Sequence, residues 1–167
     1  MSLNNIELYS ICMGYDLPLQ GIYMKDELVK IKNIENGLFI INMDSSTDSR
    51  GGTHWICCYF TDKSAFYFDS FGCVCPTEID IFIKRRFKKY YWNGWICQDM
   101  SSDLCGFFCV GLGIHIKHHF TKDLITTCND YVNYFQDDTK KNDATLRKYF
   151  SMYKPINKIV MKKLLNK

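Results

Sequence analysis

The chain has 167 residues, of which 47% are hydrophobic and 23% are charged, as is usual for a soluble globular protein. It is long enough to bury a core, and three prolines and ten glycines exclude a disordered or fibrous chain. The net charge of +3 permits contact with nucleic acid but does not argue for it. We expect a single domain over residues 1–167.

Nine cysteines are a high and odd number. The first residues show no secretory signal, and no apolar run has the length of a membrane span, so we expect neither secretion nor a membrane anchor. Free thiols in a reducing compartment are therefore favoured over a disulfide scaffold. No C-x-x-C pair is present and we expect no metal, with a structural zinc site as the alternative.

The first part of the chain predicts short elements. Residues Asn4–Met13 have apolar side chains at helical spacing, and Asn4 or Asn5 can serve as the N-cap. A loop with a short extended piece follows, and residues 26–31 fit either a turn or a helix. The apolar run Gly37–Met43 is typical of a strand that is covered on both faces.

A polar loop then leads into a predicted β-hairpin. Its strands are His54–Phe60 and Ala65–Phe71, joined by a tight turn. Counting back across the turn places His54, near the start of one strand, almost opposite Asp69, near the end of the other. We therefore expect the imidazole and the carboxylate to lie close together.

A helix is predicted over Thr77–Tyr91, with Thr77 as N-cap, followed by a turn at Asn93–Gly94 and a short strand at Trp95–Gln98. The apolar residues assigned to the inner face of the helix are Ile79, Ile81, Phe82 and Phe87. The basic residues assigned to its wet side are Lys84, Arg85, Arg86, Lys88 and Lys89.

The segment Cys105–Phe120 is apolar nearly all round, which places a helix in the middle of the protein, with Ser102 or Asp103 as its cap. A further helix is predicted over Asp143–Tyr153, and Pro155 interrupts the tail. These elements predict one α+β domain, with a central mixed β-sheet packed against the buried helix.

Cys105 is a candidate nucleophile, because a thiol at a helix N-terminus lies in positive potential that favours the thiolate. A nearby imidazole, that of His54, could accept its proton, and the Asp69 carboxylate could orient the imidazole. The amide of Gln98, seven positions before the thiol, could stabilise an oxyanion. Gly51 and Gly52 permit close approach of a substrate, and Trp55 supplies an apolar wall: these three are the candidate substrate-binding residues.

Each residue also has a structural interpretation. Cys105 could be a buried helix cysteine like Cys109, and His54 a structural histidine at a strand entrance. Asp69 could cap a turn, and Gln98 could lie in a surface loop. Jointly, however, they supply every role of a thiol hydrolase, in a chain order that differs from that of papain.

Three motifs carry a resemblance to a known family: Gly51-Gly52-Thr53-His54-Trp55, Tyr67-Phe68-Asp69-Ser70-Phe71-Gly72 and Gln98-x6-Cys105-Gly106-Phe107-Phe108-Cys109. Together they resemble the adenovirus maturation protease (adenain) and its relatives, which include the Ulp-type SUMO proteases and proteases of virophages. The likeness runs from about residue 38 to residue 115. It implies an adenain/Ulp-like fold whose buried helix starts at the catalytic cysteine.

The resemblance implies a cysteine endopeptidase that cuts viral capsid and core precursors at Gly-containing sites during virion maturation. It implies Cys105 as nucleophile, His54 as general base and acid, Asp69 as orienting acid and Gln98 in the oxyanion hole. Adenain has Glu where this chain has Asp69, and the SUMO proteases use Asp. It further implies a monomer in the virion and in the infected host cell, within reducing cytoplasm or nucleus.

Adenain is also stimulated by DNA and by a disulfide-linked peptide. No cysteine stands here where that peptide would attach, so we expect no required cofactor. DNA stimulation is open, because the five basic residues at 84–89 and the Lys-rich tail could contact phosphates, although a solvated helix face explains them as well. Two rival functions remain, namely a protease for SUMO or ubiquitin-like modifiers and a non-enzymatic DNA-binding virion protein.

Overall fold

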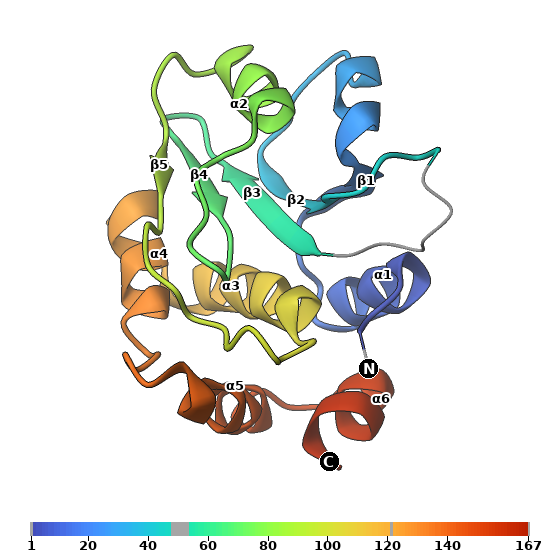
Figure 1. Ribbon diagram of the computed structural model, residues 1–167, viewed down its shortest axis with the longest axis vertical. Helices are drawn as coiled ribbons and strands as arrows, with labels where there is room; N and C mark the ends of the chain where they lie inside the picture. Colours follow the sequence, from blue (N-terminus) through green and yellow to red (C-terminus); the bar gives the residue numbers. More distant parts are fainter. Residues whose placement is uncertain (1, 48–53, 121, 167) are drawn as a thin grey trace.

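The computed structural model describes residues 2–47, 54–120 and 122–166 (Figure 1). Five strands form one sheet in the order β1-β2-β3-β4-β5. The strands are β1 (Leu19–Met24), β2 (Gly37–Asn42), β3 (Trp55–Phe60), β4 (Ala65–Phe68) and β5 (Tyr91–Trp92). The two outer pairs, β1–β2 and β4–β5, are parallel, and the inner pairs are antiparallel. The predicted α+β fold with a mixed sheet is confirmed.

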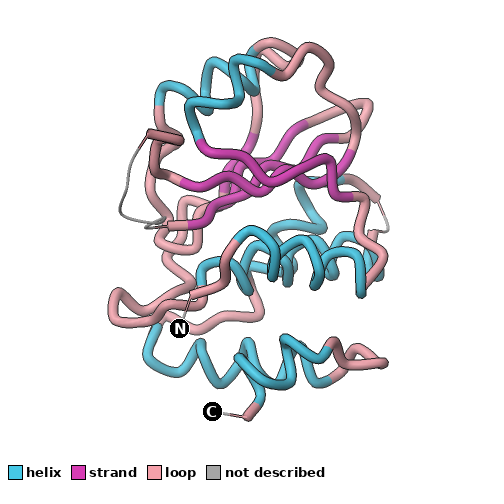
Figure 2. Tube along the Cα trace, turned by 90° about the vertical axis from the view of Figure 1, so that its right-hand side faces the viewer, coloured by secondary structure: helices cyan, strands magenta, loops and turns pink. Residues whose placement is uncertain are grey.

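Helices cover both faces of the sheet (Figures 1 and 2). On one face lie α1 (Asn5–Gly14), α3 (Cys105–His119) and α4 (Leu124–Val132). On the other face lie the 3₁₀ helix η1 (Lys25–Lys30) and α2 (Thr77–Lys84). An outer layer beyond α3 holds η2 (Thr139–Lys141), α5 (Asn142–Ser151), α6 (Lys158–Val160) and the π turn η3 (Met161–Leu165). Among the described residues, none of the helices combines the length and apolar character that crossing a bilayer requires.

The sheet separates two hydrophobic clusters, which explains why its central strands are apolar without interruption. Leu38 and Ile40 of β2 pack toward α3, whereas Phe39 and Ile41 of the same strand pack toward α2. Successive side chains of a strand point to opposite faces, so a strand covered on both sides needs an apolar residue at every position. The prediction that this strand is covered on both faces is confirmed.

Helix α3 lies between the sheet and the outer helices, and its residues 105–116 are all buried. Its N-cap position is Leu104, which provides no side-chain hydrogen bond. The prediction that Ser102 or Asp103 caps the helix is therefore wrong, and the Ser102 hydroxyl instead donates to Asp143 Oδ1 at 2.8 Å. At α1 the predicted cap is confirmed, because Asn4 Oδ1 accepts from the backbone N–H of Glu7 at 2.9 Å.

The region after the hairpin differs most from prediction. Helix α2 ends at Lys84 instead of continuing to Tyr91, and its N-cap is Pro76. The guanidinium groups of Arg85 and Arg86 donate to the carbonyls of Leu28 and Ile34, which ties the end of α2 to η1 and to the loop after it. On α2 itself, Ile79 and Phe82 are buried as predicted, whereas Ile81 is exposed and Ile83, which was not assigned to the inner face, is buried.

Two further corrections concern strands and helices. Residues 95–98 do not form a strand, because the N–H groups of Cys97 and Gln98 both donate to the carbonyl of Ser70. In a β-sheet, the N–H groups of two successive residues would not donate to the same carbonyl. Helix α4 was not predicted, although Asp123 caps it by accepting from the N–H of Thr126 at 2.8 Å. The helix predicted over Asp143–Tyr153 is confirmed as α5.

Candidate active site

The thiol of Cys105 lies at the first residue of α3, and the residue is 5% exposed. The backbone N–H of Trp55, at the start of β3, donates to its sulfur with N···S 3.5 Å. Because no side chain caps α3, its first amides add positive potential around the sulfur. Both features place hydrogen-bond donors or positive potential at the sulfur.

An imidazole and a carboxylate meet beside this thiol. His54 Nε2 lies 2.8 Å from Asp69 Oδ1, and both side chains are largely buried. The other ring nitrogen of His54, Nδ1, is buried and makes no hydrogen bond to a described residue. Burial lowers the pKa of His54, but the hydrogen bond to Asp69 and the neighbouring Cys105 side chain outweigh it and raise the pKa to about 9. The imidazole is therefore a strong base held between an acid and a thiol.

Several groups hold Asp69 itself. Its Oδ1 also accepts from the backbone N–H of Phe71 at 2.8 Å, and its Oδ2 accepts from the Tyr67 hydroxyl at 3.5 Å. The side chain of Asn93 makes two hydrogen bonds to the backbone of Asp69. Asn93 Oδ1 accepts from the Asp69 N–H at 3.0 Å, and Asn93 Nδ2 donates to the Asp69 carbonyl at 2.7 Å. Asn93 directly follows β5, so its side chain extends the hydrogen bonding between β4 and β5 beyond the last backbone pair. It thereby fixes the backbone of Asp69, from which the carboxylate projects.

Gln98 is 1% exposed and both ends of its amide are engaged. The Oε1 atom accepts from the Ser70 hydroxyl at 2.6 Å, and Nε2 donates to the carbonyl of Ser102 at 2.7 Å. Because Nε2 carries two hydrogens, one donor remains after the bond to Ser102. Gln98 is thus a buried amide held at both ends in the segment that leads to Cys105, and it is not a surface glutamine.

Of the candidate substrate-binding residues, Gly51 and Gly52 lie outside the described residues. Trp55 is 7% exposed, and its indole Nε1 donates to the carbonyl of Leu3 at 2.8 Å. Its side chain lines a pocket of about 320 Å³ between the N-terminal segment and the ends of β1 and β2. Trp55 therefore links the two sites: it lines this pocket, and its backbone N–H donates to the Cys105 sulfur.

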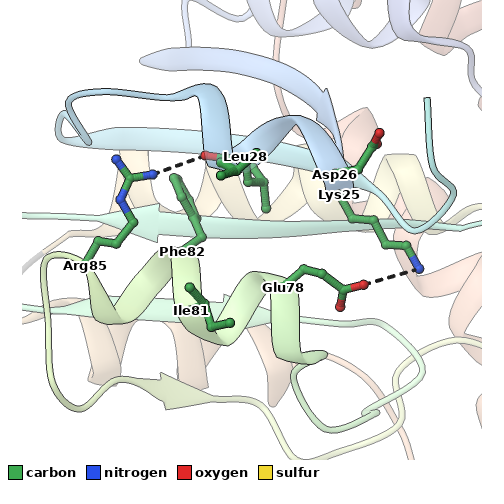
Figure 3. Close-up of a pocket in the computed structure, with 8 residues that line it drawn as sticks. Lys25, Asp26, Leu28, Glu78, Ile81, Phe82 and Arg85 are labelled. Atoms are coloured by element: carbon green, nitrogen blue, oxygen red, sulfur yellow. Dashed lines mark hydrogen bonds and ion pairs between the residues drawn. The ribbon is translucent and has the colours of Figure 1, made fainter. Parts of the chain in front are cut away.

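A second pocket, of about 340 Å³, lies on the opposite face of the sheet, between η1 and α2 (Figure 3). Leu28 and Phe82 form its apolar wall, and Lys25 and Glu78 approach each other at 3.9 Å across one end. No residue of the candidate catalytic set lines it. It is separate from the thiol site.

The five basic residues do not form one free cationic face. Lys84 pairs with Asp80 at 2.8 Å. Arg85 donates to backbone carbonyls of η1 and the loop after it, and Arg86 donates to Ile34 O and Asn36 Oδ1. Lys88 and Lys89 are exposed. Contact of the five with DNA stays a prediction, and the two exposed lysines are the members best placed for it.

All nine cysteines are unpaired. Burial raises the pKa of the Cys12 and Cys97 thiols to about 12, and it raises that of Cys109 well above its usual value. These thiols are therefore neutral core groups at physiological pH. Within the described ranges, no three His, Cys, Asp or Glu side chains gather as a cation site.

Sequence reasoning missed the residues that support the site, above all Phe71 and Asn93. The phenyl ring of Phe71 stacks on the His54 imidazole, with centroids 4.6 Å apart and planes at 28°. Asn93 was recognised only as part of an Asn-Gly turn signal. No pattern in a single sequence shows that such a turn lies against the end of another strand.

Comparison with known proteins adds one structural likeness. No protein-family model matches the chain, and no curated protein does. Among solved structures, the chain is similar to the pS273R protease of ASFV, with 15% sequence identity and a TM-score of 0.43. The match covers 81% of this chain and 68% of that protein.

Proposed function

We propose that this chain is a cysteine peptidase that uses the Cys105 thiol as nucleophile. The observation that carries the proposal is the His54–Asp69 pair at 2.8 Å, beside a thiol whose sulfur accepts a backbone N–H at the start of a buried helix. The nucleophile is the first residue of α3, the base directly precedes β3 and the orienting acid directly follows β4. A histidine with a purely structural role would need neither a carboxylate partner nor a neighbouring thiol at a helix N-terminus.

In the proposed reaction, Nδ1 of His54 takes the thiol proton and the sulfur attacks the scissile carbonyl carbon. The negative charge that develops on the carbonyl oxygen is stabilised by the free N–H of Gln98 and by the backbone N–H of Cys105. The imidazolium then protonates the leaving amine as the C–N bond breaks. Finally the imidazole removes a proton from water, which hydrolyses the thioester and restores the thiol.

The substrate class follows from the family resemblance of the three motifs. We propose polypeptides cut after small residues, in particular Gly, with viral capsid or core precursors as the biological targets. The protein would then act in the virion and in the infected cell, as a monomer and without a required cofactor. The exposed Lys88 and Lys89 are the residues through which we expect DNA to stimulate it.

The decisive experiment is incubation with candidate structural precursors, with new termini mapped by mass spectrometry. The wild type should generate new termini and Cys105→Ala should generate none. Cys128→Ala is the matched control, because Cys128 is a buried thiol of α4 outside the candidate site, and it should cut like the wild type. Full cleavage by Cys105→Ala would refute the proposal.

A protease for SUMO or ubiquitin-like modifiers is the second candidate. It is favoured by exposed apolar side chains next to the site: Trp95 and Ile96, which lie between Asn93 and Gln98 in the chain, are each about half exposed. Such residues could contact a folded modifier. Labelling of Cys105 by a SUMO or ubiquitin vinyl-sulfone probe would assign this substrate class, and labelling only by short Gly-containing peptide probes would favour the endopeptidase.

A further inference from the structure

The ring of Phe71 lies flat against the ring of His54. Their centroids are 4.6 Å apart and their planes differ by 28°. The β3–β4 register pairs Cys57 with Phe68, and counting that register onward places His54 opposite Phe71. The chain leaves the ladder at Asp69, yet the phenyl ring still faces the imidazole as a cross-strand neighbour would.

The backbone of Phe71 contacts the other partner of the pair. Its N–H donates to Asp69 Oδ1 at 2.8 Å, and this is the same oxygen that accepts from His54 Nε2. One residue therefore touches both members of the pair, the imidazole with its ring and the carboxylate with its amide.

The turn that carries Phe71 is itself fixed. The N–H of Gly72 donates to the carbonyl of Asp69 at 2.8 Å, which closes a four-residue turn around Ser70 and Phe71. Gly72 has φ +66°, and a Cβ there would lie 2.8 Å from the carbonyl carbon of Trp95. The close packing of this turn on the backbone of Trp95 fixes the backbone position from which the phenyl ring projects.

We propose that Phe71 is a positioning residue, whose ring holds the His54 imidazolium and whose amide holds the Asp69 carboxylate. The claim deepens the proposed function, because it concerns the charged pair on which thiol attack depends. Phe71 takes no part in proton transfer and touches no reacting atom. Its effect is exerted through His54 and Asp69.

The face of an aromatic ring attracts a cation, so the stack favours imidazolium over neutral imidazole. Leu at position 71 would keep an apolar cover over His54 but would remove that face, whereas Tyr would keep both. The other titratable groups that face the pair are unchanged by either substitution. They are Cys105 beside His54, and Tyr67, Cys73, Cys75, Cys97 and Cys109 near Asp69.

The test is the pH dependence of Cys105 alkylation by iodoacetamide, located by peptide mapping, in the wild type and in Phe71→Leu and Phe71→Tyr. Thiol attack needs the Cys105 thiolate beside the His54 imidazolium, and with a less stable imidazolium this thiolate–imidazolium pair forms at higher pH. We expect the midpoint of the alkylation rise to shift upward by about half a pH unit in Phe71→Leu and to stay at the wild-type value in Phe71→Tyr. Phe120→Leu, the same change at a half-exposed residue beyond the far end of α3, should have no effect.

Peptide cleavage supplies the second readout. We expect kcat to fall about 3- to 10-fold in Phe71→Leu with KM unchanged, and to recover in Phe71→Tyr. An unshifted alkylation midpoint in a folded Phe71→Leu protein would overturn the inference, as would an equal shift in Phe71→Tyr. Alkylation needs no peptide substrate, so the two proposals can fail separately. If the wild type cuts no peptide but the alkylation midpoint still shifts in Phe71→Leu, the proposed function is refuted and the role of Phe71 is supported.

Discussion

His54 and Asp69 are 15 positions apart in the chain, yet Nε2 of the first lies 2.8 Å from Oδ1 of the second. The β3–β4 hairpin brings them near each other, and the turn after β4 directs the carboxylate toward the ring. The pair thus depends on local structure and not on a long-range domain arrangement.

Asp69→Asn is the sharpest test of the orienting acid, because Asn has nearly the same shape but carries no charge. We expect kcat to fall by about 10²- to 10⁴-fold, with KM much less affected. The pKa of His54 should fall as well, since Asp69 is a principal cause of its elevation. Steady-state kinetics would show the first effect, and NMR titration of the imidazole the second. Unchanged kcat would exclude Asp69 from the mechanism.

The raised pKa of His54 also predicts how stability varies with alkaline pH. The folded pKa, about 9, exceeds the unfolded value of 6.5, so the folded state holds the proton more tightly. The resulting stabilisation is fully present below pH 6.5 and is lost as pH rises through about 9. Thermal unfolding of the wild type should therefore show a decline in Tm over this window. The His54→Gln variant should show a smaller decline.

The lowered pKa of His115 predicts that folding stability also declines as the pH falls into the acid range. It lies buried in α3 with Nδ1 3.0 Å from the Tyr149 hydroxyl. Burial, with a smaller contribution from His119, lowers its pKa to about 4. The unfolded chain then binds the proton more readily, so stability is fully present above pH 6.5 and falls as pH drops toward 4. Unfolding curves of His115→Phe should depend less on pH in this range, and an identical dependence would contradict the assignment.

Two glycines with positive φ form a matched pair for testing the Phe71 turn. Gly72 has φ +66° and no room for a Cβ, whereas Gly94 has φ +55° and its nearest neighbour would lie at 3.8 Å. Both alanine variants incur the strain of a left-handed backbone, about 1 kcal/mol. Only Gly72→Ala also collides with the backbone of Trp95. In denaturant titrations it should lose at least about 1 kcal/mol more than Gly94→Ala, and it should lose activity too. Equal losses would show that the turn tolerates displacement.

The elements with strong local signals were predictable. Two short apolar runs separated by a turn-like segment located the β3–β4 hairpin, and the long apolar run located α3. The same reasoning brought His54 and Asp69 together, because hairpin register follows from counting. The approximate positions of three of the four candidate catalytic side chains depend only on these two elements.

What escaped prediction depends on tertiary contacts. Helix α2 ends where Arg85 and Arg86 bind carbonyls of η1 and of the loop after it, and nothing within the helix sequence signals that end. Residues 95–98 read as a strand by composition, but Ser70 draws two of their amides to one carbonyl. The supporting contacts of Phe71 and Asn93 likewise arise between segments that only the fold brings together.

Both backbone polar groups of Trp55 contact sulfur atoms that lie one turn of α3 apart. Its N–H donates to Cys105 and its carbonyl accepts from Cys109, each with the heavy atoms 3.5 Å apart. Since His54 is the preceding residue, any sliding of β3 along α3 must first break this double attachment. Local fluctuations of the domain should therefore change the distance between the His54 ring and the Cys105 sulfur very little. The amide hydrogen of Trp55 should be among the slowest to exchange with deuterium.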